Sequence, residues 1–230
     1  PYPHGNKILA CMQPRDTAWG GFLDSDILVL RPHDISRFLR PGHVACSVAA
    51  SIRWAPPDLW QAAYGAFGLP VPEERVTLMR QKTPQVAPYY SSGFVLFPEA
   101  AADGFAATWL ETARKLDGVP ALAPHRRPYL DQISLPVAIR RAGLSWLEIP
   151  EADHFILGGR LRGKPLGPRA EITAVHYRRW KVLTEAGLAQ AGFDALAAQV
   201  GTKRVHRIFR VDPPVAAGAG ASRADRDGSD

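Results

Sequence analysis

Short apolar runs alternate with stretches of helical periodicity along most of the chain. Runs rich in β-branched and aromatic residues predict strands, and apolar residues that recur every three or four positions predict helices. The predicted strands lie near residues 20–25, 44–50, 76–80, 92–97, 144–150 and 171–177. The predicted helices cover residues 6–13, 56–68, 99–116, 129–143 and 184–199. This alternation predicts an α/β sandwich with a mostly parallel mixed sheet flanked by helices.

Several of these helices carry end signals. Asn6 is expected to cap the first helix, since its side chain can accept a hydrogen bond from a backbone N–H of the first turn. Gly68 and Gly118 are expected to end the second and third helices. Pro136 lies inside the fourth, where its missing N–H and its ring predict a kink or an early end.

The composition changes after Asp212. Residues 213–230 consist almost entirely of Pro, Ala, Gly, Ser and charged residues, and they have little apolar surface to bury. We therefore expect a disordered tail there. Residues 1–212 are expected to form one domain, because this length suits a single core.

Two aspartates interrupt the apolar run "FLDSDILVL", residues 22–30. An unpaired charge is costly to bury, so Asp24 and Asp26 need partners. In a strand they would point to the same face, at the end where open α/β sheets bind ligands. Two close carboxylates favour a divalent cation, with phosphate oxygens completing its shell. A turn capped by these carboxylates and by Ser25 explains the pattern equally well.

Composition and charge narrow the function classes. The net charge of +6 suits nucleic acid, an anionic membrane surface or a phosphorylated small molecule. The sequence has no nucleic-acid-binding motif and no apolar run near the ~20 residues that a membrane span needs. The two cysteines lack metal-ligand spacing and suit a reducing compartment. We expect a cytoplasmic protein, with peripheral attachment to a membrane left open.

Three later segments also carry polar residues next to apolar strands or helices. Ser91, Ser92 and Gly93 precede the apolar run "FVLF", and the glycine would let a ligand approach closely. Asp131 and Gln132 lie near the start of the fourth helix, where Asp131 could equally be a cap. His176 ends the strand "AVHY" and precedes a basic run, although a lone histidine in such a place is more often a hydrogen-bonded surface residue.

In order and spacing, the segments "FLDSDILVL", "SSGFVLF", "YLDQ" and "AVHYRRWK" resemble the metal-dependent nucleotide-sugar glycosyltransferases of the GT-A fold. The similarity is greatest to glycosyltransferase family 8, the glycogenin-like and bacterial galactosyltransferase-like group, and it spans residues 6–183. It implies transfer of a hexose, with retention of configuration, from a nucleotide-diphosphate donor. A UDP-sugar is the expected donor, and the acceptor is a glycan, a lipid or a protein.

The resemblance also implies roles for individual residues. Asp24, Asp26 and His176 would bind Mn²⁺, or Mg²⁺, and Asp24 would also contact the ribose. Asp131 and Gln132 would be catalytic, beside the transferred sugar. The remaining substrate-binding residues would be Lys7, Ser91, Ser92, Gly93, Arg179 and Lys181, of which Arg179 and Lys181 would hold the diphosphate.

Departures from the family pattern leave alternatives open. Ser91 stands where the family has asparagine, and the family's first strand and helix, which hold the nucleobase, are not found before residue 6. This fits an N-terminal truncation, or an altered relative that serves as a non-catalytic GT-A-like binding module. Phosphatases of the haloacid dehalogenase type also carry Asp-x-Asp after an apolar strand, but Leu28 departs from their motif.

Overall fold

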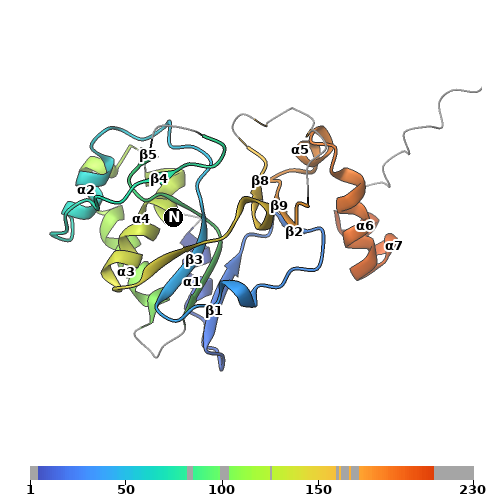
Figure 1. Ribbon diagram of the computed structural model, residues 1–230, viewed down its shortest axis with the longest axis horizontal. Helices are drawn as coiled ribbons and strands as arrows, with labels where there is room; N and C mark the ends of the chain where they lie inside the picture. The colour runs from blue at the N-terminus through green and yellow to red at the C-terminus, as the bar shows by residue number, and fades with distance from the viewer. Residues whose placement is uncertain are drawn as a thin grey trace, which may run out of the picture.

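The structure, a computed structural model, describes residues 5–81, 85–98, 104–124, 126–158, 161, 166 and 171–209. In this part of the chain the strands form a four-stranded, a three-stranded and a two-stranded sheet. Helices lie between them along the sequence, which agrees with the expected α/β class (Figure 1). The predicted tail, residues 213–230, lies outside the described residues.

The four-stranded sheet has the order β1 (Trp19–Leu23), β6 (Tyr90–Pro98), β3 (His43–Val48) and β7 (Ser145–Glu148). It is mixed, but the expectation of mostly parallel strands is wrong. β6 is antiparallel to both of its neighbours, and among these described strands only β3 and β7 pair in parallel. The alternation of helices and strands in the sequence does not determine which strands become neighbours. Here β6 lies between β1 and β3, and it runs opposite to both.

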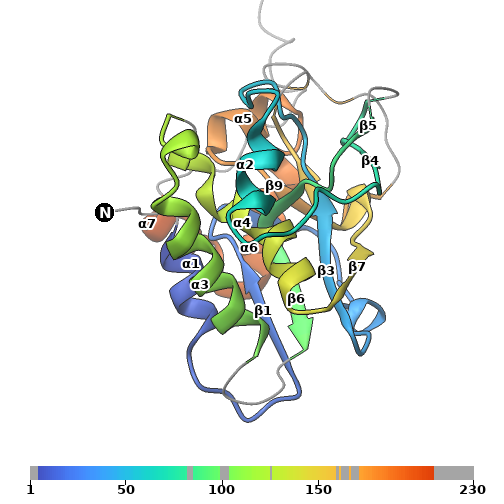
Figure 2. The ribbon, with the colours of Figure 1, turned by 90° about the vertical axis from the view of Figure 1, so that its left-hand side faces the viewer.

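Four helices lie on one side of this sheet: α1 (Asn6–Cys11), α2 (Leu59–Gly65), α3 (Phe105–Asp117) and α4 (Arg126–Arg141) (Figure 2). The apolar positions that predicted α3 are all buried, which is why this helix forms where the periodicity placed it. Trp109 is fully buried, and its Nε1 donates to Ser134 Oγ on α4 at 3.0 Å. This bond joins the two helices above the sheet.

Two helix details differ from the predictions. Gly5, not Asn6, precedes the first turn of α1, and no side-chain capping bond is found there among the described residues. α4 contains Pro136 and still continues to Arg141, so the proline does not end it. Gly68 has a φ of +65°, a conformation in which glycine is favoured over other residues, and it follows α2 as predicted.

The three-stranded sheet has the order β2 (Ile27–Val29), β9 (Ala174–His176) and β8 (Phe155–Ile156). The helices α5 (Trp180–Glu185), α6 (Ala189–Val200) and α7 (Thr202–Phe209) lie beside this sheet, away from α2, α3 and α4 (Figure 1). The sequence predicted a single helix over 184–199. The structure instead has the end of α5 and most of α6 in this range, separated at Gly187, whose φ is +77°.

The remaining elements are short. They are the strands β4 (Val76–Thr77) and β5 (Gln85–Val86), and the 3₁₀ turns η2 (Ser36–Phe38), η3 (Pro120–Leu122) and η4 (Glu151–Asp153). None of the helices in the described part of the chain combines the length and the apolar character that a bilayer crossing requires.

The turn after β1 connects the two larger sheets. β1 ends at Leu23, and the backbone N–H of Ile27 donates to the carbonyl of Asp24 at 3.0 Å, so Asp24, Ser25 and Asp26 form a turn and not part of a strand. The expected strand over 20–25 is therefore too long. Because this turn joins two sheets, its side chains lie where residues from both can reach them.

His154 is buried at the junction of the two sheets, directly after η4. Its ring packs edge-on against Phe94 of β6, with ring centroids 6.0 Å apart. Burial lowers the pKa of His154 to about 3. The imidazole is therefore neutral in the folded protein at ordinary pH, whereas in the unfolded chain it titrates near 6.5.

This difference predicts a stability loss in acid. Below pH 6.5 the unfolded chain binds a proton at His154, whereas the folded chain binds that proton only near pH 3. The full stability is thus present above pH 6.5 and decreases as the pH falls. We expect the free energy of unfolding to drop by about 2 kcal/mol between neutrality and roughly pH 5 from this residue alone.

Urea unfolding of the wild type and of His154→Phe over this pH range measures the effect. The variant lacks the titrating group, so its unfolding free energy should depend less steeply on pH. Parallel pH profiles for the two proteins would rule out His154 as the source.

Candidate functional site

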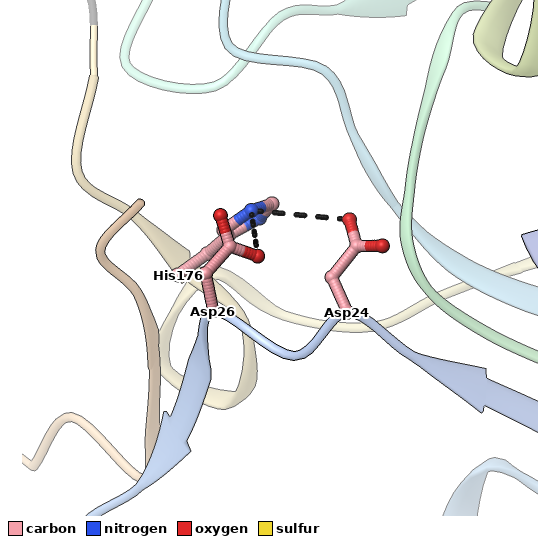
Figure 3. Close-up of side chains that lie close together, drawn as sticks. All are labelled: Asp24, Asp26 and His176. Atoms are coloured by element: carbon pink, nitrogen blue, oxygen red, sulfur yellow. Dashed lines mark ion pairs between the residues drawn. The ribbon is translucent and has the colours of Figure 1, made fainter. Parts of the chain in front are cut away.

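Asp24, Asp26 and His176 bring their ligand atoms together where the two larger sheets meet (Figure 3). The aspartates come from the turn between β1 and β2, and the histidine ends β9. One ligand atom of each lies within 4.8 Å of the others. His176 Nε2 is 3.1 Å from Asp26 Oδ1 and 3.9 Å from Asp24 Oδ2.

Backbone pairing fixes this arrangement. The N–H of Asp24 donates to the carbonyl of Gly93 on β6 at 2.8 Å, and the N–H of Tyr177 donates to the carbonyl of Asp26 at 3.0 Å. In the register of β2 and β9, Ile27 lies opposite His176. The turn is thus held on one side by the four-stranded sheet and on the other by the three-stranded sheet.

Gly93 leaves the space that these side chains occupy. A Cβ atom at this position would lie 2.9 Å from His176 Cε1 and 3.0 Å from Asp24 Oδ2. A side chain here would therefore push the histidine and the aspartate apart. The lack of a side chain, and not an unusual backbone angle, is the reason for glycine at this point of β6.

The two carboxylates differ in their electrostatic surroundings. A hydrogen bond from His176 lowers the pKa of Asp26. Burial raises the pKa of Asp24, against the opposing effect of Lys7. Two carboxylate oxygens and an imidazole nitrogen at this spacing are a donor set that fits a divalent cation, and the imidazole suits Mn²⁺ better than Mg²⁺.

Lys7 links Asp24 to α4. Its Nζ lies 2.9 Å from Asp24 Oδ1 and 3.0 Å from Asp131 Oδ2. Ser92 Oγ donates to the same Asp131 oxygen at 2.5 Å. Burial disfavours the charge of Lys7, but the carboxylates of Asp131 and Asp24 outweigh this and raise its pKa. The buried charges are thus paired, which a low-dielectric interior requires.

A cavity of about 190 Å³ opens beside Asp24 and His176, two members of this cluster. Ser91, Ser92 and Gly93 of β6 form part of its wall. Gln132 lines it from α4, and its Oε1 accepts a hydrogen bond from the Tyr89 hydroxyl at 2.8 Å. Asp24 and His176 also reach the cavity, so a ligand in it would touch the proposed cation ligands.

Other predicted site residues lie elsewhere. Asp131 is 2% exposed and is not among the described residues that line the cavity. Arg179 and Lys181 are not among them either; the Lys181 side chain is 85% exposed and lies 3.9 Å from Glu185. Arg178 lines the cavity instead. Arg178 lies beyond the end of β9 and has a φ of +61°, so the two-residue period of a strand could not have placed it there.

Sequence reasoning also missed the aromatic side of the cavity. Trp54 and Tyr129 stack with ring centroids 4.1 Å apart and planes 6° apart, and both line the cavity. Trp54 lies in a loop without periodicity, so no signal in the sequence indicated it. His154, whose Nε2 lies 3.3 Å from His176 Nδ1, was not singled out by any pattern in the sequence either. Only the tertiary structure brings the two histidines together.

Comparison with known proteins gives one finding. The family model described as "Rhodobacterales glycosyltransferase domain" matches residues 1–143, more than half of the chain. This range includes both aspartates, Gly93 and Gln132, but it ends before His176. No curated protein and no solved structure matches the chain. On the strength of the family match, the chain belongs to the Rhodobacterales glycosyltransferase domain family.

Proposed function

We propose that the protein is a metal-dependent glycosyltransferase of GT-A type that moves a sugar from a nucleotide-diphosphate donor, a UDP-sugar, to an acceptor. The observation that carries this proposal is the cluster of Asp24, Asp26 and His176 beside a cavity, in a chain of a glycosyltransferase family. Glycosyl transfer from such a donor needs a group that neutralises the diphosphate as it leaves. The three side chains offer a place for one.

In this proposal Asp24, Asp26 and His176 hold Mn²⁺ or Mg²⁺. When bound, the ion would offset the negative charge that develops on the departing diphosphate. Arg178 lies on the cavity wall and adds a fixed positive charge, and its guanidinium can donate two parallel hydrogen bonds to phosphate oxygens. We assign diphosphate binding to Arg178, in place of Arg179 and Lys181.

Gln132 and the segment Ser91 to Gly93 would contact the transferred sugar in this proposal, because they line the cavity. The Oε1 atom of Gln132 accepts the Tyr89 hydrogen bond, so its amide nitrogen is the group it offers to a sugar hydroxyl. Asp131 is bonded to Lys7 and Ser92. Its role in this proposal is to position these groups. A hexosyl donor and retention of configuration remain expectations from the family 8 resemblance.

The acceptor would enter along the aromatic side of the cavity. The stacked rings of Trp54 and Tyr129 form a flat apolar surface beside the polar groups. Binding sites commonly combine such an apolar wall with a few polar groups that set orientation. This surface would pack against a sugar ring, and it favours a glycan over the lipid and protein acceptors.

Calorimetry with UDP and Mn²⁺ tests the cation site. We expect the wild type to bind UDP when Mn²⁺ is present, and to lose binding when EDTA removes the ion. Asp26→Ala removes a carboxylate oxygen from the donor set and should weaken Mn²⁺-dependent binding by more than about tenfold. Asp58→Ala is the matched control, because Asp58 is exposed at the start of α2 and makes no capping bond among the described residues.

Equal heats for the wild type and Asp26→Ala would refute the metal–diphosphate assignment. Hydrolysis of a UDP-sugar, followed as release of UDP, separates the enzyme from a binding module. Tight UDP binding without any turnover, tested over several donors and glycan acceptors, would favour the non-catalytic module.

Gly93→Ala tests the geometry of the same site without removing a ligand. The added Cβ would displace His176 or Asp24, and we expect Mn²⁺ affinity to fall by about tenfold. The control is Gly65→Ala in α2, where a Cβ meets no described atom within 4 Å. That change should raise stability by about 0.5–1 kcal/mol and leave Mn²⁺ binding unchanged. Electron paramagnetic resonance of free Mn²⁺ measures both affinities; wild-type affinity in Gly93→Ala would contradict the proposed crowding.

A further inference from the structure

A chain of hydrogen bonds leads from His176 into the interior. Its Nδ1 lies 3.3 Å from His154 Nε2, and His154 Nδ1 lies 3.2 Å from Ser47 Oγ. Ser47 Oγ in turn donates to the carbonyl of Ile149 at 2.8 Å. The three side chains are buried and come from three separate parts of the chain: β3, the segment after η4, and β9.

The hydrogen bond from Ser47 to Ile149 determines which atom donates in each of the other bonds of this series. A serine hydroxyl has one hydrogen, and that of Ser47 is used on the Ile149 carbonyl. Its oxygen can therefore only accept from His154, which places the proton of His154 on Nδ1. A neutral imidazole carries a single N–H, so His154 Nε2 is an acceptor. His176 must then donate through its own Nδ1.

The two rings lie close together. The planes of His154 and His176 are 13° apart, and their centroids are 5.4 Å apart. Phe94 packs edge-on against His154 and restricts its rotation. With the Nδ1 proton of His176 directed at His154, its Nε2 faces Asp24 and Asp26 (Figure 3).

We propose that Ser47 and His154 are positioning residues that hold a proton on Nδ1 of His176, so that Nε2 is reserved for a cation shared with the two aspartates. The role given to these two residues rests on the proposed metal-dependent function. The hydrogen bonds themselves do not depend on it. Nε2, on the other side of the ring, lies 3.1 Å from Asp26 Oδ1. Partners behind a metal-binding histidine commonly fix its tautomer in this way, and here the partner is a second imidazole.

Nuclear magnetic resonance of ¹⁵N-labelled, metal-free protein tests the tautomer directly. We expect His176 Nδ1 to give a slowly exchanging N–H signal in the wild type. His154→Phe removes the acceptor and should abolish that signal. His154→Gln places an amide oxygen near the former Nε2 position and should restore it. His206→Phe, an exposed histidine of α7, is the control and should leave it unchanged.

Mn²⁺ affinity, measured by electron paramagnetic resonance, gives the second measurement. We expect His154→Phe to bind Mn²⁺ about 10- to 100-fold more weakly than the wild type, and His154→Gln to recover most of the loss. A bare Nδ1 on His176 in the wild type would overturn the proposal, as would an unchanged Nδ1 signal in folded His154→Phe. The wild-type spectrum decides the question of direction even where a variant fails to fold.

The two proposals fail in different ways. If the wild type shows the protonated Nδ1 but binds neither Mn²⁺ nor UDP, the metal-dependent function is wrong and the hydrogen-bond chain stands. If the wild type binds Mn²⁺ and UDP with Nδ1 unprotonated, the cation site stands and the positioning role of Ser47 and His154 is wrong.

Discussion

The site depends on a turn whose backbone is bonded on both sides. Asp24 donates its N–H to Gly93 of one sheet, and Asp26 accepts from Tyr177 of the other. Backbone bonds hold these positions more firmly than long side chains could, since few rotatable groups separate them from the sheets. Two carboxylates are thereby kept close despite their repulsion. Any cation that binds them meets a preformed donor set, and little ordering has to accompany its binding.

Charge balance is the second constraint on this turn. Lys7 draws Asp24 toward Asp131 and Ser92, while His176 lies against Asp26. The two carboxylates therefore have different partners and different pKa directions, although they are two residues apart. A cation placed between them would compete with Lys7 for Asp24. Since Lys7 also has Asp131, it keeps a buried partner when Asp24 turns to a cation.

The sequence indicated the class of fold and much of the site, but not their arrangement. The run around Asp24 and Asp26 could be identified because unpaired carboxylates are costly to bury in an apolar stretch. α3 could be predicted because its apolar residues recur at helical spacing along its buried face. Strand order could not be predicted, since β6 meets β1 and β3 through contacts between distant residues. Arg178, Trp54 and His154 were missed for the same reason, because only tertiary packing brings them to the cavity or to His176. The roles proposed for the site residues remain predictions.

The division of the site between two parts of the chain has a chemical consequence. The residues that match the family model supply both aspartates and the lysine that neutralises one of them. His176, His154 and Arg178 come later, from β9 and the segments next to it. Without this second part Asp26 would lose its imidazole partner, and Lys7 would be the main positive charge near the pair, which favours an internal ion pair over a bound cation. The three-stranded sheet therefore does more than extend the fold: by packing His176 against the turn, it adds an imidazole nitrogen to the two carboxylates, and the proposed cation site depends on that addition.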